Sequence, residues 1–241
     1  MDIKDNQLIL TSDVKLEEFT KTSFKITHIL IITCFLIIIY TTIFSNNKSI
    51  RPILYLELFI CGISSIIYTV LNYKLHNYRV SENSDELKKE IKQKPINWNS
   101  ISKTRYFGWT FTTPAMLIVL CLVLSMNSKI AFDYLTIISI IILDWIMLYI
   151  GILGENKVIE RFKAMILGFI PFFLMFLIIF VKFILPKSIA FSNFIFVSYF
   201  ILWALYGIAF IMDERYRNIL MNILDFTAKG LIGIIICYFY F

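Results

Sequence analysis

Residues 219–241, ILMNILDFTAKGLIGIIICYFYF, form an apolar stretch that carries two opposite charges, Asp225 and Lys229. About 20 residues of helix cross the roughly 30 Å of hydrocarbon in a bilayer. A charge near the middle of such a helix costs from about 2.5 to more than 10 kcal/mol, so it faces the interior of a bundle. Asp225 precedes Lys229 by four residues, on the same helix face. Two interpretations stand: a self-neutralising ion pair, or a buried amine that reacts with an aldehyde.

The composition is that of a membrane protein. Of the 241 residues, 59% are hydrophobic and 17% are charged, and the mean hydropathy is +0.76. A soluble domain has about 45–50% apolar residues. The net charge of +6 is spread over connecting segments without a basic, aromatic-rich surface, so we expect no nucleic-acid partner. We also expect no signal peptide, because the charged N-terminal stretch lacks an apolar core.

No enzymatic or metal centre is indicated. The four cysteines lie inside apolar runs, and their spacings fit neither a disulfide framework nor a zinc site. His28 and His76 stand alone, and no Ser/His/Asp or Cys/His set can be assembled. We therefore expect a protein that is not an enzyme and binds no metal.

Apolar stretches of spanning length predict an all-α membrane protein, a bundle of seven transmembrane helices. They lie near 26–44, 51–74, 104–126, 130–153, 160–184, 189–211 and 217–240. Residues 1–25 are expected to form a polar, amphipathic segment, and residues 26–241 the seven-helix domain. The longest connection, 75–103, is expected to hold a short polar helix that begins after Ser84 and ends at Pro95.

Polar and aromatic side chains recur on one face of several spans. The sets are Arg105, Trp109, Thr113 and Met116 in the third span, Asp144, Met147 and Gly151 in the fourth, and Trp203, Tyr206 and Phe210 in the sixth. Such stripes are usually packing faces. A buried arginine and a buried aspartate require partners, however, and aromatic walls beside a glycine suit a flat apolar ligand.

These motifs resemble those of the microbial (type 1) rhodopsins. Residues 105–114, RYFGWTFTTP, resemble the R-Y-x-x-W-x-x-T-T-P signature of the third helix in that family. Residues 225–229, DFTAK, resemble the D-x-(S/T)-A-K of the seventh helix, which carries the retinal lysine. WALY at 203–206 and the spaced Asp144, Met147 and Gly151 resemble the sixth and fourth helices. The resemblance covers all seven helices in order, and the short, Ile- and Lys-rich chain is similar to viral-type members.

The resemblance implies that all-trans retinal is bound covalently to Lys229 as a protonated Schiff base, with Asp225 as its counterion and Arg105 balancing Asp225. The implied pocket comprises Trp109, Thr113, Met116, Met147, Gly151, Trp203, Tyr206 and Phe210. Thr113 and Asp144 resemble the hydrogen-bonded pair that couples isomerisation to helix movement in the family. The implied partners are retinal, the lipid bilayer, transported ions and further copies of the chain in a homo-oligomer.

Two departures from the family pattern bear on function. Gly108 stands where proton pumps of the family have an acidic proton acceptor, and Val119 stands where they often keep a carboxyl donor. Neither side chain titrates, which puts pumping by the ordinary route in doubt. Gly108 either leaves room for water or an anion, or allows close helix contact.

Three polar residues are candidates for an ion pathway or gate, together with Arg105, Gly108 and Asp144. Glu57, in the second span, is either a donor, gate or cation-binding group or a carboxylate near enough to the interface to stay hydrated. The Ser64 hydroxyl either lines a wet path or bonds back to its own helix. Asn222, one turn before Asp225, is expected in the same polar network.

A light-gated ion channel, channelrhodopsin-like, is the favoured function. The alternatives are a light-driven proton pump with an atypical relay through Glu57 and Asp225, and a sensory photoreceptor that signals through a partner. The sequence stops at Phe241, directly after the seventh span, so we expect no transducer domain within it. Orientation in the membrane stays open. Lys and Arg concentrate on the face of the N-terminus, which favours a cytoplasmic N-terminus, whereas the resemblance implies an N-terminus outside.

Overall fold

The computed structural model describes residues 3–80 and 96–240, and within them every regular element is a helix. Six spans are formed by α1 (Ile3–Phe44), α2 (Arg51–Val80), α3 (Trp98–Ser128), α4 (Tyr134–Glu155), α5 (Arg161–Ile179) with the π-helical turn η2 (Phe180–Ile184), and α6 (Ala190–Phe210). The last span joins α7 (Glu214–Asp225), the π-helical η3 (Phe226–Leu231) and α8 (Ile232–Tyr240). A short 3₁₀ turn, η1 (Lys48–Ile50), precedes α2. Seven helices of the described chain are long and apolar enough to cross a membrane, which confirms the predicted fold class.

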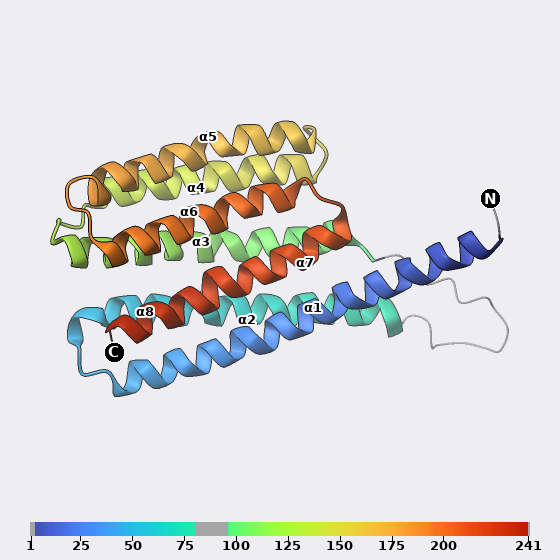
Figure 1. Cartoon of the computed structure of the whole chain (residues 1–241), viewed down its shortest axis with the longest axis horizontal. Helices are drawn as coiled ribbons and strands as arrows, with labels where there is room; N and C mark the ends of the chain where they lie inside the picture. The colour runs from blue at the N-terminus through green and yellow to red at the C-terminus, as the bar shows by residue number, and fades with distance from the viewer. Residues whose placement is uncertain (1–2, 81–95, 241) are drawn as a thin grey trace.

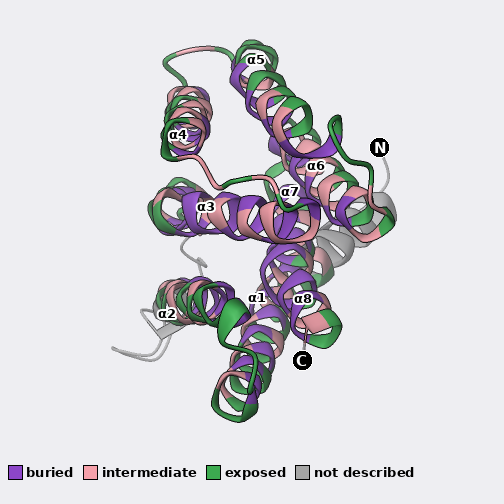
Figure 2. Cartoon of the chain, turned by 90° about the vertical axis from the view of Figure 1, so that its left-hand side faces the viewer, coloured by how far each residue is buried: buried purple, intermediate pink, exposed green. Residues whose placement is uncertain are grey.

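The helices run back and forth along one axis, so the N- and C-termini lie at opposite ends of the bundle (Figure 1). Viewed along that axis, the buried residues lie on the helix sides that face the centre (Figure 2). The most apolar window of α3 is 67% buried and that of the last span is 56% buried, against 28% for α4 and for α6. The third and seventh spans therefore form the interior of the bundle, and they carry the two strongest motifs of the sequence.

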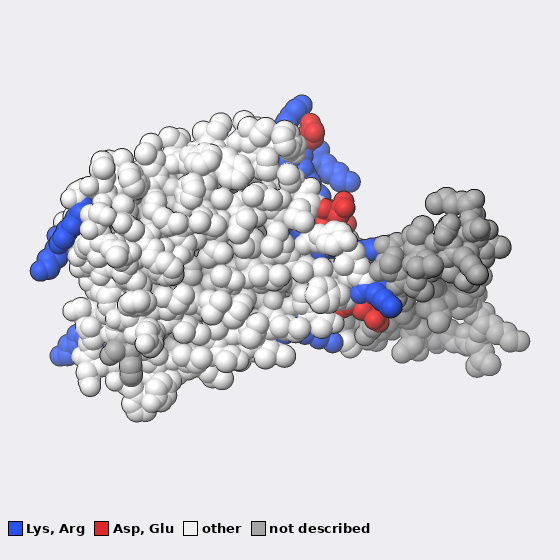
Figure 3. Space-filling view, in the orientation of Figure 1, with Lys and Arg blue, Asp and Glu red and all other residues white. Residues whose placement is uncertain are grey.

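The outer surface matches a bilayer. On the face shown in Figure 3, a broad band without charged side chains covers the middle of the bundle, and the visible Lys, Arg, Asp and Glu gather at its two ends. Large apolar side chains such as Ile43, Leu135 and Phe162 are more than half exposed on the helices. Such exposure would be costly in water over a whole surface, but it is the normal state of a side chain that faces lipid.

The predicted start of the first helix is wrong, and the predicted polar helix in the longest connection is not tested. The first helix does not begin near residue 26, because α1 runs without a break from Ile3. Its early turns are polar, so the apolar pattern alone does not reveal that they are helical. The short polar helix expected between Ser84 and Pro95 lies outside the described residues. The division of the chain into a polar segment and a seven-helix domain stays a prediction.

The last span changes its helical winding at the lysine. Residues Phe226–Leu231 follow a π-helical path, in which the Ile232 N–H donates to the Thr227 carbonyl, five residues back. Single π-turns inside α-helices often occur at functional sites, because the wider turn shifts the register of the side chains that follow. Here the turn contains Lys229, so it helps to set the direction of the lysine side chain relative to Asp225.

Gly108 allows α3 to approach α2 closely. A Cβ atom at position 108 would lie 2.7 Å from Cγ1 of Ile67 and 3.2 Å from its Cδ1. The space beside Gly108 is thus filled by an apolar side chain of α2. Of the two interpretations left open by the sequence, close helix packing accounts for the glycine.

We predict that Gly108→Ala destabilises the protein, by about 1–3 kcal/mol for an overpacked contact, despite the gain of up to about 1 kcal/mol in helix propensity. In an Ile67→Ala background the same substitution should be neutral or stabilising, because the clash is gone. Thermal unfolding in detergent measures both effects. Gly62→Ala on α2 is the matched control, since a Cβ there would lie at an ordinary contact distance, 3.6 Å from Cε2 of Phe35. A loss of stability that persists in the Ile67→Ala background would contradict this account.

Candidate functional site

A cavity of about 110 Å³ lies in the middle of the bundle, between α3, α4, α5, α6 and the last span. All nine residues that the sequence places in the pocket, other than the counterion, line it: Trp109, Thr113, Met116, Met147, Gly151, Trp203, Tyr206, Phe210 and Lys229. The wall is almost wholly aromatic, aliphatic and thioether, and Lys229 is its single charged residue. The arrangement suits an apolar, conjugated ligand that is anchored by an amine.

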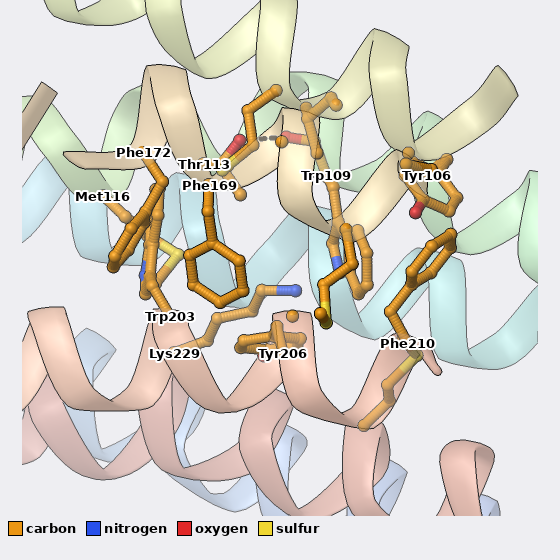
Figure 4. A pocket seen from close by; sticks show the side chains of 18 residues that line it. Tyr106, Trp109, Thr113, Met116, Phe169, Phe172, Trp203, Tyr206, Phe210 and Lys229 are labelled. Carbon is orange, nitrogen blue, oxygen red and sulfur yellow. Dashed lines mark hydrogen bonds between the residues drawn. The ribbon is translucent and has the colours of Figure 1, made fainter. Parts of the chain in front are cut away.

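The aromatic side chains are spread along the direction of the helices (Figure 4). Met116 and Trp203 lie toward one end of the cavity, and Tyr106 and Phe210 toward the other. Trp109 and Tyr206 make an edge-on contact, with ring centroids 5.3 Å apart and planes at 84°. Side chains in such contacts hold one another in place, so the cavity has firm, flat walls.

The sequence did not predict that α5 forms part of the cavity wall. Ala164, Met165, Gly168, Phe169 and Phe172 all line the cavity, and so do Tyr106, Leu148, Gly207 and Met221 from other spans. The spacing of Ala164, Gly168 and Phe172, four residues apart, marks one helix face, but α5 is apolar on every side and offers no contrast. Gly168 matters for fit, because a Cβ there would meet no atom within 4 Å. The wall is therefore open at this point, where a ligand can pack.

Asp225 is the centre of the charged part of the site. Its Oδ1 accepts hydrogen bonds from Lys229 Nζ at 2.6 Å, Tyr206 Oη at 2.9 Å and Trp109 Nε1 at 3.1 Å. Its Oδ2 accepts from Arg105 Nη1 at 2.6 Å and Tyr68 Oη at 2.9 Å. The two oxygens thus have different neighbours. Oδ1 contacts residues that line the cavity, and Oδ2 contacts Arg105 and Tyr68 in the polar region next to it. The expected neighbours Arg105, Asp225 and Lys229 are all brought together.

The charges at this centre do not cancel. Arg105, Asp225 and Lys229 are at most 4% exposed, and they contribute two cations and one carboxylate. Among the described residues, no other carboxylate forms an ion pair with either cation. Buried charges are tolerated when they are paired and when hydrogen bonds satisfy the remaining atoms. The five donors satisfy both oxygens of Asp225, whereas Arg105 Nε has no hydrogen-bond partner among the described residues. Within that part of the chain, Asp225 is the one carboxylate that pairs with both cations.

Asn222 belongs to the same network, as expected. Its Oδ1 accepts from Arg105 Nη2 at 2.8 Å and from Tyr68 Oη at 3.0 Å, and its Nδ2 donates to Ser23 Oγ at 2.8 Å. No sequence pattern singles out Ser23, a serine near the start of an apolar span. The network therefore reaches from the last span to α1, α2 and α3.

Thr113 and Asp144 form the predicted link between α3 and α4. The Thr113 hydroxyl lies 2.7 Å from Asp144 Oδ2 and 2.8 Å from the Trp109 carbonyl, so its one proton is shared between them. Asp144 is fully buried, and its Oδ1 has no hydrogen-bond partner among the described residues. Because Thr113 also lines the cavity, a change in the shape of a bound ligand would act directly on this link.

The remaining candidates lie apart from the charged centre. Glu57 is 2% exposed and packs against the last span, where a Cβ at Gly233 would come within 2.6 Å of its Oε2. Within the described chain it makes no ion pair and no hydrogen bond, and it is not joined to Asp225. The Ser64 hydroxyl donates to the Ile60 carbonyl at 2.6 Å, so it bonds back to its own helix. Val119 is fully buried.

A second ionic cluster, also missed from sequence, joins the helix ends beyond Phe210. Glu155, at the end of α4, pairs with Arg161 at 2.9 Å and with Arg217 at 3.4 Å. Arg217 is only 1% exposed. The cluster ties the ends of α4, α5 and α7 together, and Gly154 beside it is packed against Phe210, since a Cβ there would meet that ring at 2.9 Å.

Comparisons with known proteins agree with this geometry. The family model of bacteriorhodopsin-like proteins matches residues 18–241. The crystal structure of viral rhodopsin OLPVRII is 28% identical and superposes with a TM-score of 0.80, over 92% of this chain and 97% of that one. A thermophilic rhodopsin is 18% identical, with a TM-score of 0.72 over 92% of both chains. The proton pumping rhodopsin AR2 from the marine alga Acetabularia acetabulum is 19% identical, with a TM-score of 0.66 over 91% and 94% of the two chains. The last two likenesses show the fold alone, and no curated protein sequence matches the chain.

Proposed function

This chain belongs to the bacteriorhodopsin-like protein family, and from that premise we propose that it is a light-gated ion channel with all-trans retinal bound covalently to Lys229. Family membership and the seven spans make it a retinal-binding, light-driven, multi-pass membrane protein. The anchoring residue, the roles of the pocket residues and the passive transport of ions are our proposal. In this proposal the protein conducts ions across the lipid bilayer, and several copies of the chain form a homo-oligomer.

The observation that carries the proposal is the position of Lys229. Its amine is nearly buried, lines an aromatic cavity and lies 2.6 Å from Asp225. When bound, retinal supplies an aldehyde that condenses with the amine, a visible absorption band and a light-driven change of shape. The Asp225 carboxylate would stabilise the positive charge at the anchoring nitrogen. Trp109 on α3 and Trp203 on α6 would pack against the polyene and restrict its movement. Thr113 passes movement of the ligand to Asp144 and hence to α4.

The lack of a titratable side chain at positions 108 and 119 favours a channel over a pump. A pump needs an acceptor and a donor that exchange protons with the anchoring nitrogen in turn. Position 108 holds a glycine packed on Ile67, and position 119 holds a buried valine. Asp225, the single carboxylate at the nitrogen, already accepts five hydrogen bonds. Passive conduction requires no such relay.

One observation favours a pump as the second candidate. Glu57 is a buried carboxyl group on α2 that packs against the same span as Lys229. Buried ionisable residues inside a membrane usually mark a pathway. In that case Glu57 and Asp225 would exchange protons with the anchoring nitrogen from opposite sides.

Lys229→Ala should abolish the visible absorption band that forms when all-trans retinal is added to the purified protein, because no other amine of the described residues lines the cavity. Absorption spectroscopy measures the band directly. Lys182→Ala, which removes a lysine paired with Asp133 away from the cavity, should keep the band. A full band in Lys229→Ala would show that retinal is held elsewhere.

Asp225→Asn should move the absorption maximum to longer wavelength. Light moves positive charge away from the anchoring nitrogen, so a nearby carboxylate stabilises the ground state more than the excited state. Removing that charge lowers the excitation energy by several kcal/mol, the order expected for unit charges about 4 Å apart at an effective dielectric constant of about 20. Folding should also weaken, by about 3–5 kcal/mol, because Arg105 loses its partner. An unchanged maximum in the folded variant would remove Asp225 as counterion.

Photocurrents of the channel should reverse sign with membrane voltage in patch-clamp recordings of illuminated cells. Glu57→Gln should leave that reversal in place, since a channel needs no proton exchange at Glu57. Currents of one sign at every voltage, lost in Glu57→Gln, would instead establish the pump. Ile53→Val, a conservative change at another buried position of α2, controls for general effects on expression.

A further inference from the structure

We propose that Asn222 is a positioning residue that holds the Arg105 guanidinium on Asp225, and so sets how strongly the Asp225 charge acts at Lys229. The inference rests on the proposed attachment of retinal to Lys229 for its optical readout only. Family resemblance assigns no such role to an asparagine one turn before the counterion.

The two shortest hydrogen bonds of the Arg105 guanidinium go to two different side chains, and longer ones reach Tyr68 and Asn218. Nη1 donates to Asp225 Oδ2 at 2.6 Å, and Nη2 donates to Asn222 Oδ1 at 2.8 Å. An arginine usually places both arms on one carboxylate. Residues 222 and 225 are three apart on one helix, so their side chains are neighbours and act together as one acceptor. Because Asn222 takes the second arm, Oδ1 of Asp225 remains available for Lys229, Trp109 and Tyr206.

The amide of Asn222 has one orientation that satisfies its partners. Its Oδ1 accepts from Arg105 Nη2 and shares the single proton of Tyr68 Oη with Asp225, and its Nδ2 donates to Ser23 Oγ at 2.8 Å. The reversed amide would place an N–H group against the guanidinium, which can only donate. The Ser23 hydroxyl uses its own proton on the Thr20 carbonyl at 2.7 Å, so its oxygen is left to accept. Ser23 therefore fixes the amide, and the amide fixes the guanidinium.

The alternative position for the guanidinium is already present. Asn218 Oδ1 lies 3.4 Å from Arg105 Nη2 and one helical turn further from Lys229. Without Asn222, the Nη2 arm has Asn218 as its remaining polar neighbour, and the guanidinium turns away from Asp225. The positive charge of Arg105 would then neutralise less of the Asp225 charge, and the electrostatic attraction between Asp225 and the anchoring nitrogen would be stronger. Since Asn222 is neutral, its removal leaves the net charge of the site unchanged and acts through its two partners at the counterion, the charged Arg105 and the neutral Tyr68.

The test is the absorption maximum of Asn222→Leu after addition of all-trans retinal. We expect a shift to shorter wavelength, opposite in sign to that of Asp225→Asn. Ser23→Ala should shift the maximum in the same direction by less, and the double variant should match Asn222→Leu alone, because both changes act through one amide. Thr27→Val is the matched control. It removes a donor to the main-chain carbonyl of Asn222 at 3.4 Å and should leave the maximum unchanged.

A second readout needs no retinal. In the retinal-free protein labelled with ¹⁵N-arginine, Nη1 and Nη2 of Arg105 should give separate resonances, since both arms are held. Asn222→Leu, or Ser23→Ala if the first variant does not fold, should bring the two resonances together. Separate resonances together with an unchanged maximum in these variants would overturn the proposal. A wild-type protein that forms no visible band would overturn the proposed function instead, and the resonances would still decide the role of Asn222.

Discussion

The pocket depends on one constraint: a single buried carboxylate must satisfy two buried cations. Arg105 and Lys229 approach Asp225 at 2.6 Å from opposite sides, each on its own oxygen. Neither cation can be left unpaired in the membrane interior without a large cost, so α3 and the last span are held in one register. Tyr68 of α2 and Tyr206 of α6 add hydrogen bonds to the same carboxylate. Four spans thus meet at one side chain, and the cavity lies beside it, lined also by α4 and α5.

This constraint explains which residues the sequence could predict. Arg105, Asp225 and Lys229 stand out because a charge inside an apolar span is rare and needs a partner, and the aromatic stripes beside them share the helical period. The α5 wall could not be predicted in that way. Its inner residues Ala164 and Phe172 and its lipid-facing neighbours are all apolar, so hydrophobicity gives no contrast between the two faces. The start of α1 was missed for the opposite reason, because a helix that extends beyond the bilayer no longer needs to be apolar.

Other features depend on partners that are distant in the sequence. Gly108 allowed two interpretations until Ile67, on another helix, was placed 2.7 Å from its missing Cβ. The hydrogen bond between Asn222 and Ser23 joins residues 199 apart in the chain, and no local sequence pattern predicts it. Glu57 was recognised as a buried carboxyl group, but its isolation from Asp225 is a property of the packing. Sequence therefore identified the costly groups, and the fold decided which of them act together.

The same constraint bears on the choice between passive and active transport. If Asp225 took the proton of the anchoring nitrogen, it would cease to be a carboxylate, and Arg105 would lose its one ion-pair partner within the described chain. Breaking a buried pair in this way costs about 3–5 kcal/mol. A second carboxylate could take over the pairing with Arg105, but position 108 offers none. The other groups that donate to Asp225, namely Tyr68, Trp109 and Tyr206, are neutral and cannot replace its charge. This cost is the physical reason for the channel proposed above, in which Asp225 stays ionised through the light response and no proton relay passes through it.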